Sequence, residues 1–353
     1  MSKYWNENVK GLEPYIPGEQ PKDKKYIKLN TNENPYPPSP KVTEAISKAN
    51  NGDLKLYPDP TCSNLIDKIA EYYGVSSDEV FIGNGSDEIL AFIFMTYFEK
   101  GKKILFPDIS YSFYKVYAEL FKLDYKMVKL DNEFNIPLDE LKKKNGGIIL
   151  PNPNAPTGKY ISTSQLEEVV KTNKDSVVIV DEAYVDFGGE SMIKFTKKYP
   201  NLLVVQTFSK SRALAGLRVG FAIGNKELIE GLNRIKNSMN SYTIDRIALA
   251  GAQAAIEDDK YFKKITKSII ETREKYSAEI KQLGFEVLDS KSNFIFIKHN
   301  KLKGEYIYKK LKEKGVLVRY FGSERIEDYM RVTIGTNEEM EVFVENIKEI
   351  INK

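Results

Sequence analysis

The sequence predicts an α/β fold built on a mostly parallel sheet, followed by a smaller α+β domain at the C-terminus. Two observations lead to this prediction. Up to about residue 255, short apolar, β-branched segments alternate with longer amphipathic segments, as they do in β-α-β units. Beyond that point a long charged amphipathic stretch leads into several strand-like segments and a final helix-like segment.

The larger part contains six predicted strands separated by segments with helical periodicity. The predicted strands are 80–83, 103–106, 147–150, 177–180, 202–207 and 219–224. The helical segments include 64–74, 87–101, 113–121 and 164–172. In an α/β protein such helices cover the faces of a parallel sheet, and this explains why the strands are apolar throughout.

The C-terminal part begins with a stretch, 257–283, that predicts a long connecting helix. Strand-like segments FEVL, SNFIFIK, VLVRY and MRVTIGT follow, and EEMEVFVENIKEIIN predicts the last helix. We therefore expect an N-terminal extended segment (1–30, rich in Pro, Gly and Asn), a large α/β domain (31–255) and a small α+β domain (256–353).

Composition excludes several classes of function. The 53 basic and 50 acidic side chains leave a net charge of +3, which predicts neither nucleic-acid nor membrane-surface binding. No apolar stretch approaches the roughly 20 residues of a membrane helix, and the polar start MSKYWNENVK does not resemble a secretion signal. The one cysteine, Cys62, excludes a disulfide framework and a cysteine metal site, and it favours a cytoplasmic location. No metal site is predicted, and the presence of one histidine, His299, in a polar segment after a strand indicates that the general base is another residue.

Polar residues follow the predicted strands where each strand ends. Ligands of open parallel sheets bind beyond the carboxyl ends of the strands. At those ends stand residues 83–87, 151–154, 181–184 and 209–210. The sequence therefore predicts that a glycine turn, a carboxylate, a tyrosine and a lysine meet at one edge of the sheet.

The glycine turn and the carboxylate each allow more than one interpretation. In GNGSDEILAF, backbone N–H groups at a helix start would favour an anion, while Ser86 or Asp87 as an ordinary helix cap is the alternative. Asp181 could act on a metal, a base or a cationic ring, or simply cap the next helix. Its setting in VVIVDE resembles the acidic strand end of P-loop ATPases, but the lysine loop of those enzymes is absent.

The stretch TFSKSRALAGLRVG contains a candidate nucleophile and a candidate anion ligand. The amine of Lys210 could form a Schiff base with an aldehyde when it is neutral. Arg218 follows eight residues later, and its planar fork suits a phosphate.

Taken in order, these pieces resemble the fold-type I pyridoxal-5′-phosphate aminotransferases, and within them the histidinol-phosphate aminotransferases. The resemblance covers nearly the whole chain. It rests on EPYIPG, LNTNENPYPPSP, LYPDP, GNGSDE, SYSFY, NPNAPTG, DEAYVDF, TFSKSRALAGLRVG and RVTIGT. It implies transamination of L-histidinol phosphate with 2-oxoglutarate, giving imidazole-acetol phosphate and glutamate in histidine biosynthesis.

Carried over residue by residue, the resemblance implies the roles of the cofactor site. Lys210 would hold pyridoxal 5′-phosphate as a Schiff base and later move the α-proton. Asp181 would pair with the pyridine nitrogen, Tyr184 would donate to the 3′-oxygen, and Tyr111 would stack on the ring. The phosphate ligands implied are Gly85, Ser86, Asp87, Ser209 and Arg218.

The resemblance also implies a substrate site and a homodimer. The implied substrate ligands are Arg331, Arg319 and Tyr15. Both the amino donor, histidinol phosphate, and the acceptor, 2-oxoglutarate, are anions, and arginine side chains suit such ligands. Tyr57 in LYPDP matches a tyrosine that reaches the phosphate from the other subunit, so the active sites would be shared. One position departs from the pattern: Ala155 stands where relatives often carry an asparagine that binds the 3′-oxygen. Either Asn154 or Asn152 replaces it, or Tyr184 acts without it.

Three alternatives stay open at this point. A threonine-phosphate decarboxylase or an aromatic amino acid aminotransferase would use the same Lys210, Asp181 and Tyr184. A non-enzymatic alternative is an inactive aminotransferase-like regulatory domain, although the chain contains no segment typical of a DNA-binding module.

Overall fold

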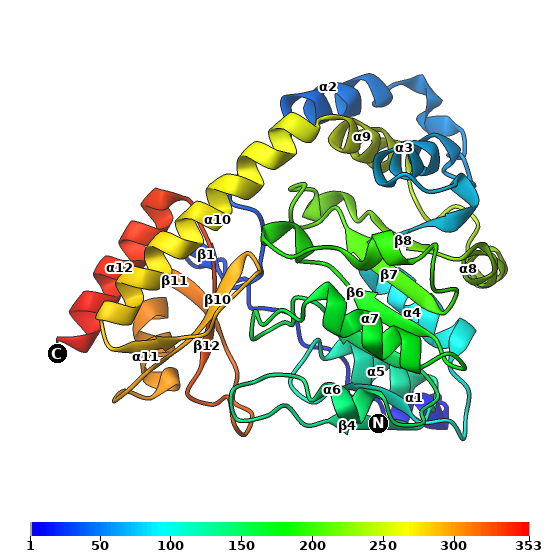
Figure 1. The fold of residues 1–353 in the computed structure, drawn as a ribbon. Coiled ribbons are helices and arrows are strands. Elements are labelled where there is room, and N and C mark those ends of the chain that lie inside the picture. The colour runs from blue at the N-terminus through cyan, green and yellow to red at the C-terminus, as the bar shows by residue number, and fades with distance from the viewer. Residues whose placement is uncertain (1, 353) are drawn as a thin grey trace.

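The computed structural model describes residues 2–352, which are arranged around two sheets (Figure 1). The strands of the larger sheet are β2 (Val80–Gly83), β3 (Ile104–Pro107), β4 (Tyr125–Val128), β5 (Ile148–Pro151), β6 (Val178–Asp181), β7 (Leu202–Thr207) and β8 (Gly220–Gly224). Their order is β2-β8-β7-β6-β5-β3-β4. The strands from β7 to β4 run parallel, whereas β8 is antiparallel to both of its neighbours. The predicted mostly parallel sheet is therefore confirmed.

Helices cover both faces of this sheet. One face carries α3 (Ser63–Tyr73), α7 (Thr163–Thr172) and α9 (Arg246–Glu257), and the other carries α4 (Gly85–Tyr97), α5 (Phe113–Leu120) and α8 (Lys226–Met239). Alternate residues of one strand face opposite ways. Accordingly Leu202 and Val204 pack with the first group, and Leu203 and Val205 with the second. Every residue of β7 is buried for this reason.

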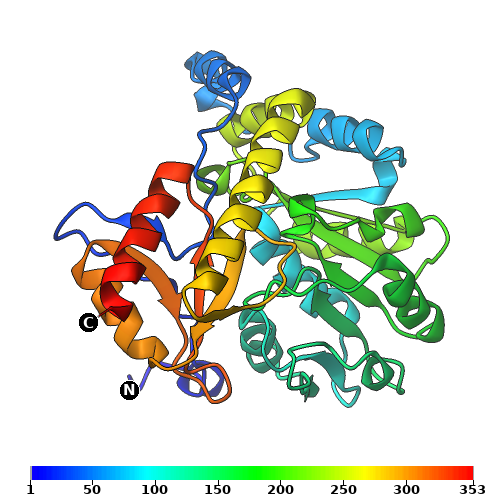
Figure 2. The same cartoon turned by 60° about the vertical axis from the view of Figure 1, so that its left-hand side comes forward.

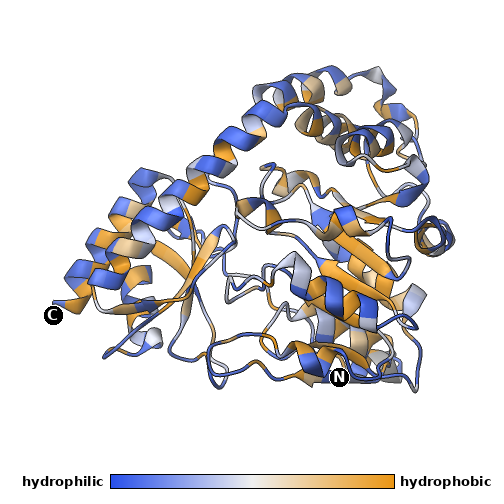
Figure 3. Ribbon diagram, viewed as in Figure 1, coloured by the Kyte–Doolittle hydropathy of each residue, from blue (hydrophilic) through white to orange (hydrophobic). Residues whose placement is uncertain are grey.

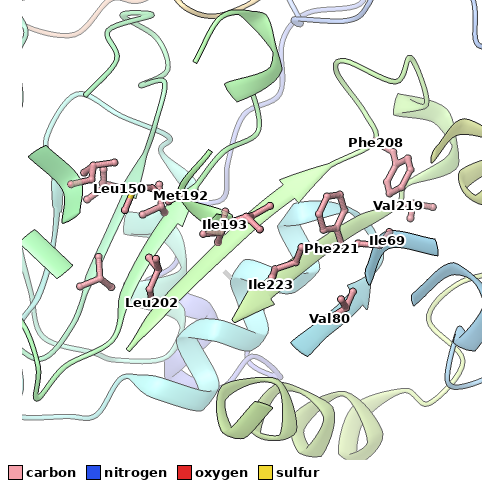
Figure 4. Close-up of a cluster of buried hydrophobic side chains, with 14 of the residues drawn as sticks. Ile69, Val80, Leu150, Met192, Ile193, Leu202, Phe208, Val219, Phe221 and Ile223 are labelled. Carbon is pink, nitrogen blue, oxygen red and sulfur yellow. The ribbon is translucent and has the colours of Figure 1, made fainter. Parts of the chain in front are cut away.

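The apolar strands form the centre of the larger unit. In Figure 3 they stand out as continuous hydrophobic ribbons, while the helices show a hydrophilic side toward solvent. Figure 4 shows part of the cluster on the α7 face, where Leu202, Ile223 and Phe221 extend from neighbouring strands toward Met192 and Ile69. This packing fixes the strand ends, and it therefore fixes the residues that follow them.

The smaller sheet is formed by β1 (Ile27–Leu29), β9 (Phe285–Val287), β10 (Phe294–His299), β11 (Val316–Tyr320) and β12 (Met330–Thr333) in the order β1-β11-β12-β10-β9. Helix α10 (Asp259–Gln282) leads into it, as predicted from the charged stretch. Helices α11 (Gly304–Glu313) and α12 (Asn337–Ile351) pack against each other, and α10 and α12 lie side by side (Figure 2).

The N-terminal residues connect the two parts. Strand β1 pairs in parallel with β11, so residues 27–29 belong to the smaller sheet. Helix α2 (Pro40–Ala49) then packs on α9, beside α3, at the far end of the larger unit (Figure 1). The short helices α1 (Glu7–Lys10) and α6 (Leu138–Leu141) complete the described α-helices. Among residues 2–352, no helix is long and apolar enough to cross a membrane.

Candidate active site

A cavity of about 300 Å³ lies at the carboxyl ends of β5, β6 and β7, where the two sheets and the N-terminal segment meet. Strand β6 and the segments next to the strands of the larger sheet contribute eight residues: Ser86, Asp87, Tyr111, Asp181, Tyr184, Ser209, Lys210 and Arg218. The smaller sheet contributes Arg319, Phe321 and Arg331, and the N-terminal segment contributes Tyr15 and residues 30–33. The convergence predicted from the strand ends is therefore present in the structure.

Lys210 stands three residues beyond the end of β7. Its Nζ donates to the carbonyl of Thr31 across 3.4 Å and lies 5.9 Å from the centre of the Tyr184 ring. Its own carbonyl accepts a 2.9 Å hydrogen bond from Asn34 Nδ2, which fixes the backbone at this point. Lys210 forms no ion pair with a carboxylate in the part of the chain that the structure describes, so its amine is not committed to a salt bridge.

Asp181 ends β6 and is only 5% exposed. Its Oδ2 accepts from the Tyr114 hydroxyl at 2.8 Å, and its Oδ1 accepts from the Ala183 N–H at 3.2 Å. Burial raises the pKa of Asp181 to about 6, although both hydrogen bonds oppose that shift. A carboxylate held in this way would be stabilised by a cation in the cavity, such as a protonated ring nitrogen.

The start of α4 forms a cradle for an anion. Its N-cap residue is Asn84 rather than Ser86 or Asp87, and the Asn84 side chain makes no cap hydrogen bond, while Glu88 Oε2 accepts from the Asn84 N–H at 2.7 Å. Backbone N–H groups in that position attract phosphate. Arg218 lies across the turn, with Nη2 3.0 Å from Asp87 Oδ2 and Nη1 3.3 Å from Ser209 Oγ.

Two glycines make this close approach possible. Gly85 has a φ of +73°, and a Cβ on it would lie 2.4 Å from Arg218 Nη2. A Cβ on Gly220 would lie 2.7 Å from the Gly85 carbonyl carbon and from the Ser86 nitrogen. Larger residues at either position would displace the arginine or the turn, so this cradle fits a phosphate group only as long as both are glycine.

Asp87 positions its neighbours rather than facing an anion. Its Oδ1 accepts from the Tyr111 hydroxyl at 2.7 Å, while its Oδ2 holds Arg218. Tyr111 is thereby fixed beside the cavity, and Tyr15 packs edge-on to it at 6.3 Å and stacks on Phe113 at 4.4 Å. Aromatic faces of this kind suit a flat ring ligand.

Two arginines of the smaller sheet stand directly opposite each other on antiparallel strands, Arg319 on β11 and Arg331 on β12. Like charges in that relationship are destabilising unless an anion lies between them. Arg331 Nη2 donates to the Asn30 carbonyl at 3.0 Å, but its buried Nε has no partner. Burial also lowers the pKa of Arg331. An anionic ligand would supply the missing acceptor.

Three predicted ligands do not line this cavity: Gly85, which directly precedes Ser86 at the start of α4, Tyr57 and Asn154. Tyr57 is 77% exposed and stacks on Tyr242 with ring centres 4.6 Å apart. Asn154 requires a correction: it is buried, and its Nδ2 donates to the Ile109 carbonyl and to Thr157 Oγ1, so it braces its own turn. The neighbouring Ala155, by contrast, lines the cavity.

His299 also lies outside the cavity. His299 ends β10, and its Nδ1 accepts from the backbone N–H groups of Lys301 and Leu302. Within residues 2–352, no group of three or more His, Cys, Asp and Glu side chains is arranged to hold a metal ion.

Sequence reasoning missed several residues of the site. Tyr114 lies within the SYSFY segment but was not singled out, and Asn32 and Asn34 lie within LNTNENP. Asn32 donates to the Tyr184 hydroxyl from a position 152 residues earlier in the chain. The density of asparagines in that short segment was the available indication, because asparagine side chains bond readily to backbone groups.

The chain is similar to known aminotransferases. The family model described as aminotransferase class I and II matches residues 24–347. A protein of Clostridium beijerinckii named histidinol-phosphate aminotransferase is 67% identical over 352 residues, covering 100% of this chain and 98% of the relative. A protein of the same name from Clostridium acetobutylicum is 60% identical, with 99% of this chain and 100% of the relative covered.

Solved structures show the same fold. The histidinol-phosphate aminotransferase of Sinorhizobium meliloti, in complex with pyridoxal-5′-phosphate, superimposes with a TM-score of 0.90 at 23% identity, covering 100% of this chain and 98% of that one. A histidinol-phosphate aminotransferase structure from Clostridium acetobutylicum gives a TM-score of 0.85 at 25% identity, covering 92% and 99%.

Proposed function

The chain belongs to the class I and II aminotransferase family, and from this premise we propose that it transfers the amino group of L-histidinol phosphate to 2-oxoglutarate. The products are imidazole-acetol phosphate and glutamate, and the reaction is a step of histidine biosynthesis. The observation that carries the proposal is the single cavity in which Lys210, Asp181 and an open phosphate cradle face two opposed arginines.

The cavity fits the family's cofactor, pyridoxal 5′-phosphate. When bound, this group supplies an aldehyde that reacts with amines and a protonated pyridine ring that accepts the electron pair of a broken Cα–H bond. The N–H groups at the start of α4, with Ser209 and Arg218, would hold the phosphate. Asp181 would hold the ring nitrogen in its protonated form, and Tyr111 would lie against the ring.

Lys210 has two tasks in this proposal. Its Nζ would hold the cofactor through the cofactor's aldehyde carbon. As a free amine, the same Nζ would take the proton from the substrate Cα and pass it on, acting as general base and then general acid. This proton transfer requires no base other than Lys210. His299 lies away from the cavity, which is consistent with that role for Lys210.

Arg319 and Arg331 bind the anionic end of each substrate in turn. Histidinol phosphate presents a phosphate, whereas glutamate and 2-oxoglutarate present carboxylates, and guanidinium groups accept either geometry. Tyr15 and the residues after it lie over this end of the cavity, because Arg319 donates to the carbonyls of Ile16 and Pro17 at 3.4 and 3.5 Å. The N-terminal segment therefore shields the substrate from water.

A homodimer is part of the same proposal. Tyr57 does not line the cavity of its own subunit. It is one of several exposed apolar residues in this region: Leu54, Leu56, Tyr57, Met239 and Tyr242. The backbone of this segment is fixed by Arg246, whose Nη2 donates to the Tyr57 carbonyl at 2.7 Å. A second copy of the chain covering these apolar residues would bring Tyr57 to the partner's phosphate cradle. A cytoplasmic location, proposed from the single buried Cys62, is consistent with this biosynthetic role.

The test is a product assay with purified enzyme and the Lys210→Ala variant as control. We expect imidazole-acetol phosphate and glutamate from histidinol phosphate and its amino acceptor, with none from the variant. Equal or faster formation of phenylpyruvate from phenylalanine, or release of CO₂ from threonine phosphate, would assign the site to a related enzyme. No turnover of any of these substrates would support a regulatory protein instead.

A further inference from the structure

Asn32 occupies a conformation that few residues adopt, and all of its polar groups are used. Its φ is +55°, in the left-handed region where asparagine and glycine are the common residues. It is 1% exposed. Its N–H donates to Thr333 Oγ1 at 3.0 Å, its carbonyl accepts from Asn293 Nδ2 at 3.0 Å, and its own Nδ2 donates to the Tyr184 hydroxyl at 2.8 Å.

The hydrogen bonds of Thr333 fix the orientation of this amide. The Thr333 hydroxyl oxygen accepts from the Asn32 N–H and donates its proton to Asn32 Oδ1 at 3.2 Å. The oxygen of the amide therefore faces Thr333 and the nitrogen faces Tyr184. Thr333 lies in β12, and Asn293, which donates to the Asn32 carbonyl, directly precedes β10, so the smaller sheet holds Asn32 in place.

The Asn32 amide determines where the Tyr184 proton points. The Tyr184 hydroxyl oxygen accepts from Asn32 Nδ2. An amide nitrogen cannot accept a hydrogen bond, so the Tyr184 hydroxyl cannot donate its proton to Asn32 Nδ2. The ring of Tyr184 is held edge-on to Phe294, with centres 5.1 Å apart. Tyr184 and Asn32 both line the cavity, so the proton is left to donate into the cavity.

We propose that Asn32 is a positioning residue that directs the Tyr184 hydroxyl proton onto the 3′-oxygen of the cofactor. The inference rests on the proposed function, because it assumes pyridoxal 5′-phosphate in this cavity. It also explains how the chain tolerates Ala155, whose methyl group lines the cavity and cannot donate. The amide comes instead from the N-terminal segment and acts through Tyr184.

Two substitutions at Asn32 separate this role from a structural one. Asn32→Asp has the same shape and still accepts from Thr333, but its carboxylate accepts the Tyr184 proton and withdraws it from the cavity. Asn32→Gly also tolerates the left-handed backbone and removes the side chain altogether. Having both variants keeps the test valid if one of them folds poorly.

The readout is the pH at which the visible absorbance of the holoenzyme changes. A hydrogen bond to the charged 3′-oxygen favours the deprotonated form, so its loss raises the apparent pKa of this colour change. We expect Tyr184→Phe to raise it by about one pH unit. Asn32→Asp should raise it similarly and Asn32→Gly in the same direction, whereas neither should add to the effect in the Tyr184→Phe background.

The outcomes distinguish this inference from the proposed function. If Tyr184→Phe shifts the colour change and both Asn32 variants titrate like the parent, Asn32 does not direct the proton. If the effect of Asn32→Asp persists in the Tyr184→Phe background, it is the electrostatic effect of an added charge and the inference is wrong. If the parent itself binds no cofactor, it is the proposed function that fails.

Discussion

Tyr114 and Asp181 form a buried hydrogen bond in which the phenol hydroxyl donates to Oδ2 of the carboxylate across 2.8 Å. Tyr114 is 0% exposed and Asp181 5%. Burial alone would disfavour the charged carboxylate, and its pKa rises from the ordinary 3.8 to about 6 in spite of this hydrogen bond. The ionised form of Asp181 is therefore destabilised by burial, and a cation in the cavity would stabilise it.

The first prediction concerns the stability of the cofactor-free protein. Because the folded state binds the Asp181 proton more tightly than the unfolded state, the contribution of Asp181 to the free energy of unfolding should fall as the pH rises from about 4 to about 6. The shift corresponds to a contribution of about 3 kcal/mol. Asp181→Asn should lose this contribution, so the difference in urea stability between parent and variant should change with pH over that range. A difference that stays constant with pH would contradict the assignment.

Binding of pyridoxal 5′-phosphate should reverse the same effect in the parent. A protonated ring nitrogen beside Asp181 stabilises the carboxylate, so the holoenzyme should lose less stability between pH 4 and 6 than the cofactor-free protein.

Glu182→Gln serves as a control. Burial raises the pKa of Glu182 to about 7, but its carboxylate accepts from Met192 N–H and Ser191 outside the cavity, so cofactor affinity should not change.

The second prediction concerns the phosphate cradle. Gly85→Ala would place a methyl group 2.4 Å from Arg218 Nη2 and force the guanidinium away. We expect the dissociation constant of the cofactor to rise at least tenfold, as measured by fluorescence titration. Gly74→Ala is the matched control, because Gly74 also has a positive φ of +65° but nothing lies within 4 Å of its added Cβ. It should lower stability by about 1 kcal/mol without weakening the cofactor. Equal cofactor affinity in Gly85→Ala and Gly74→Ala would contradict the proposal that the start of α4 binds the cofactor phosphate.

The third prediction concerns the opposed arginines. Arg331→Gln removes a partly buried guanidinium whose buried Nε has no partner among the described residues. Loss of hydrogen bonds to a charged ligand should lower kcat/KM roughly 10- to 100-fold for both histidinol phosphate and 2-oxoglutarate. Steady-state kinetics with each substrate varied in turn would measure this. The exposed Arg234, paired with Glu230, provides a control: Arg234→Gln should leave both values unchanged. An unchanged kcat/KM in Arg331→Gln would remove this arginine from the substrate site.

The fourth prediction tests whether two subunits share their sites. Tyr57→Phe should weaken cofactor binding roughly 10- to 100-fold by removing one hydrogen bond to the phosphate, and Lys210→Ala should be inactive. Refolding the two variants together should restore activity at limiting cofactor, since one site of the mixed dimer combines an intact Lys210 with an intact Tyr57. Activity no higher than that of Tyr57→Phe alone would show that each subunit works independently.

Local patterns in the sequence located much of this site. Asp181 and Lys210 follow strands whose apolar runs are long enough to be unmistakable, and parallel strands place their carboxyl ends together. Strand β4 was missed because it lies at the sheet edge and only Val128 of its residues is buried, so its pattern is not apolar. The antiparallel direction of β8 also could not be inferred, since residue composition does not encode strand direction.

Contacts between distant segments were beyond such patterns. The bonds from Asn32 to Tyr184 and from Asn34 to the Lys210 carbonyl join residues 152 and 176 positions apart. Nothing in either local sequence identifies the other partner. Asn154 illustrates a different limit: its position next to Ala155 in NPNAPTG suggested a ligand, but it does not line the cavity, and its Nδ2 donates to the Ile109 carbonyl and to Thr157 Oγ1.

The most direct test of the account is to identify the residue that carries the cofactor. Reduction of the holoenzyme with borohydride fixes pyridoxal 5′-phosphate to the amine that holds it, and mass spectrometry of the peptides then locates it. The account predicts one modified site, Lys210, in the peptide that contains TFSK. Modification of another lysine, or a protein that binds no cofactor at all, would contradict it.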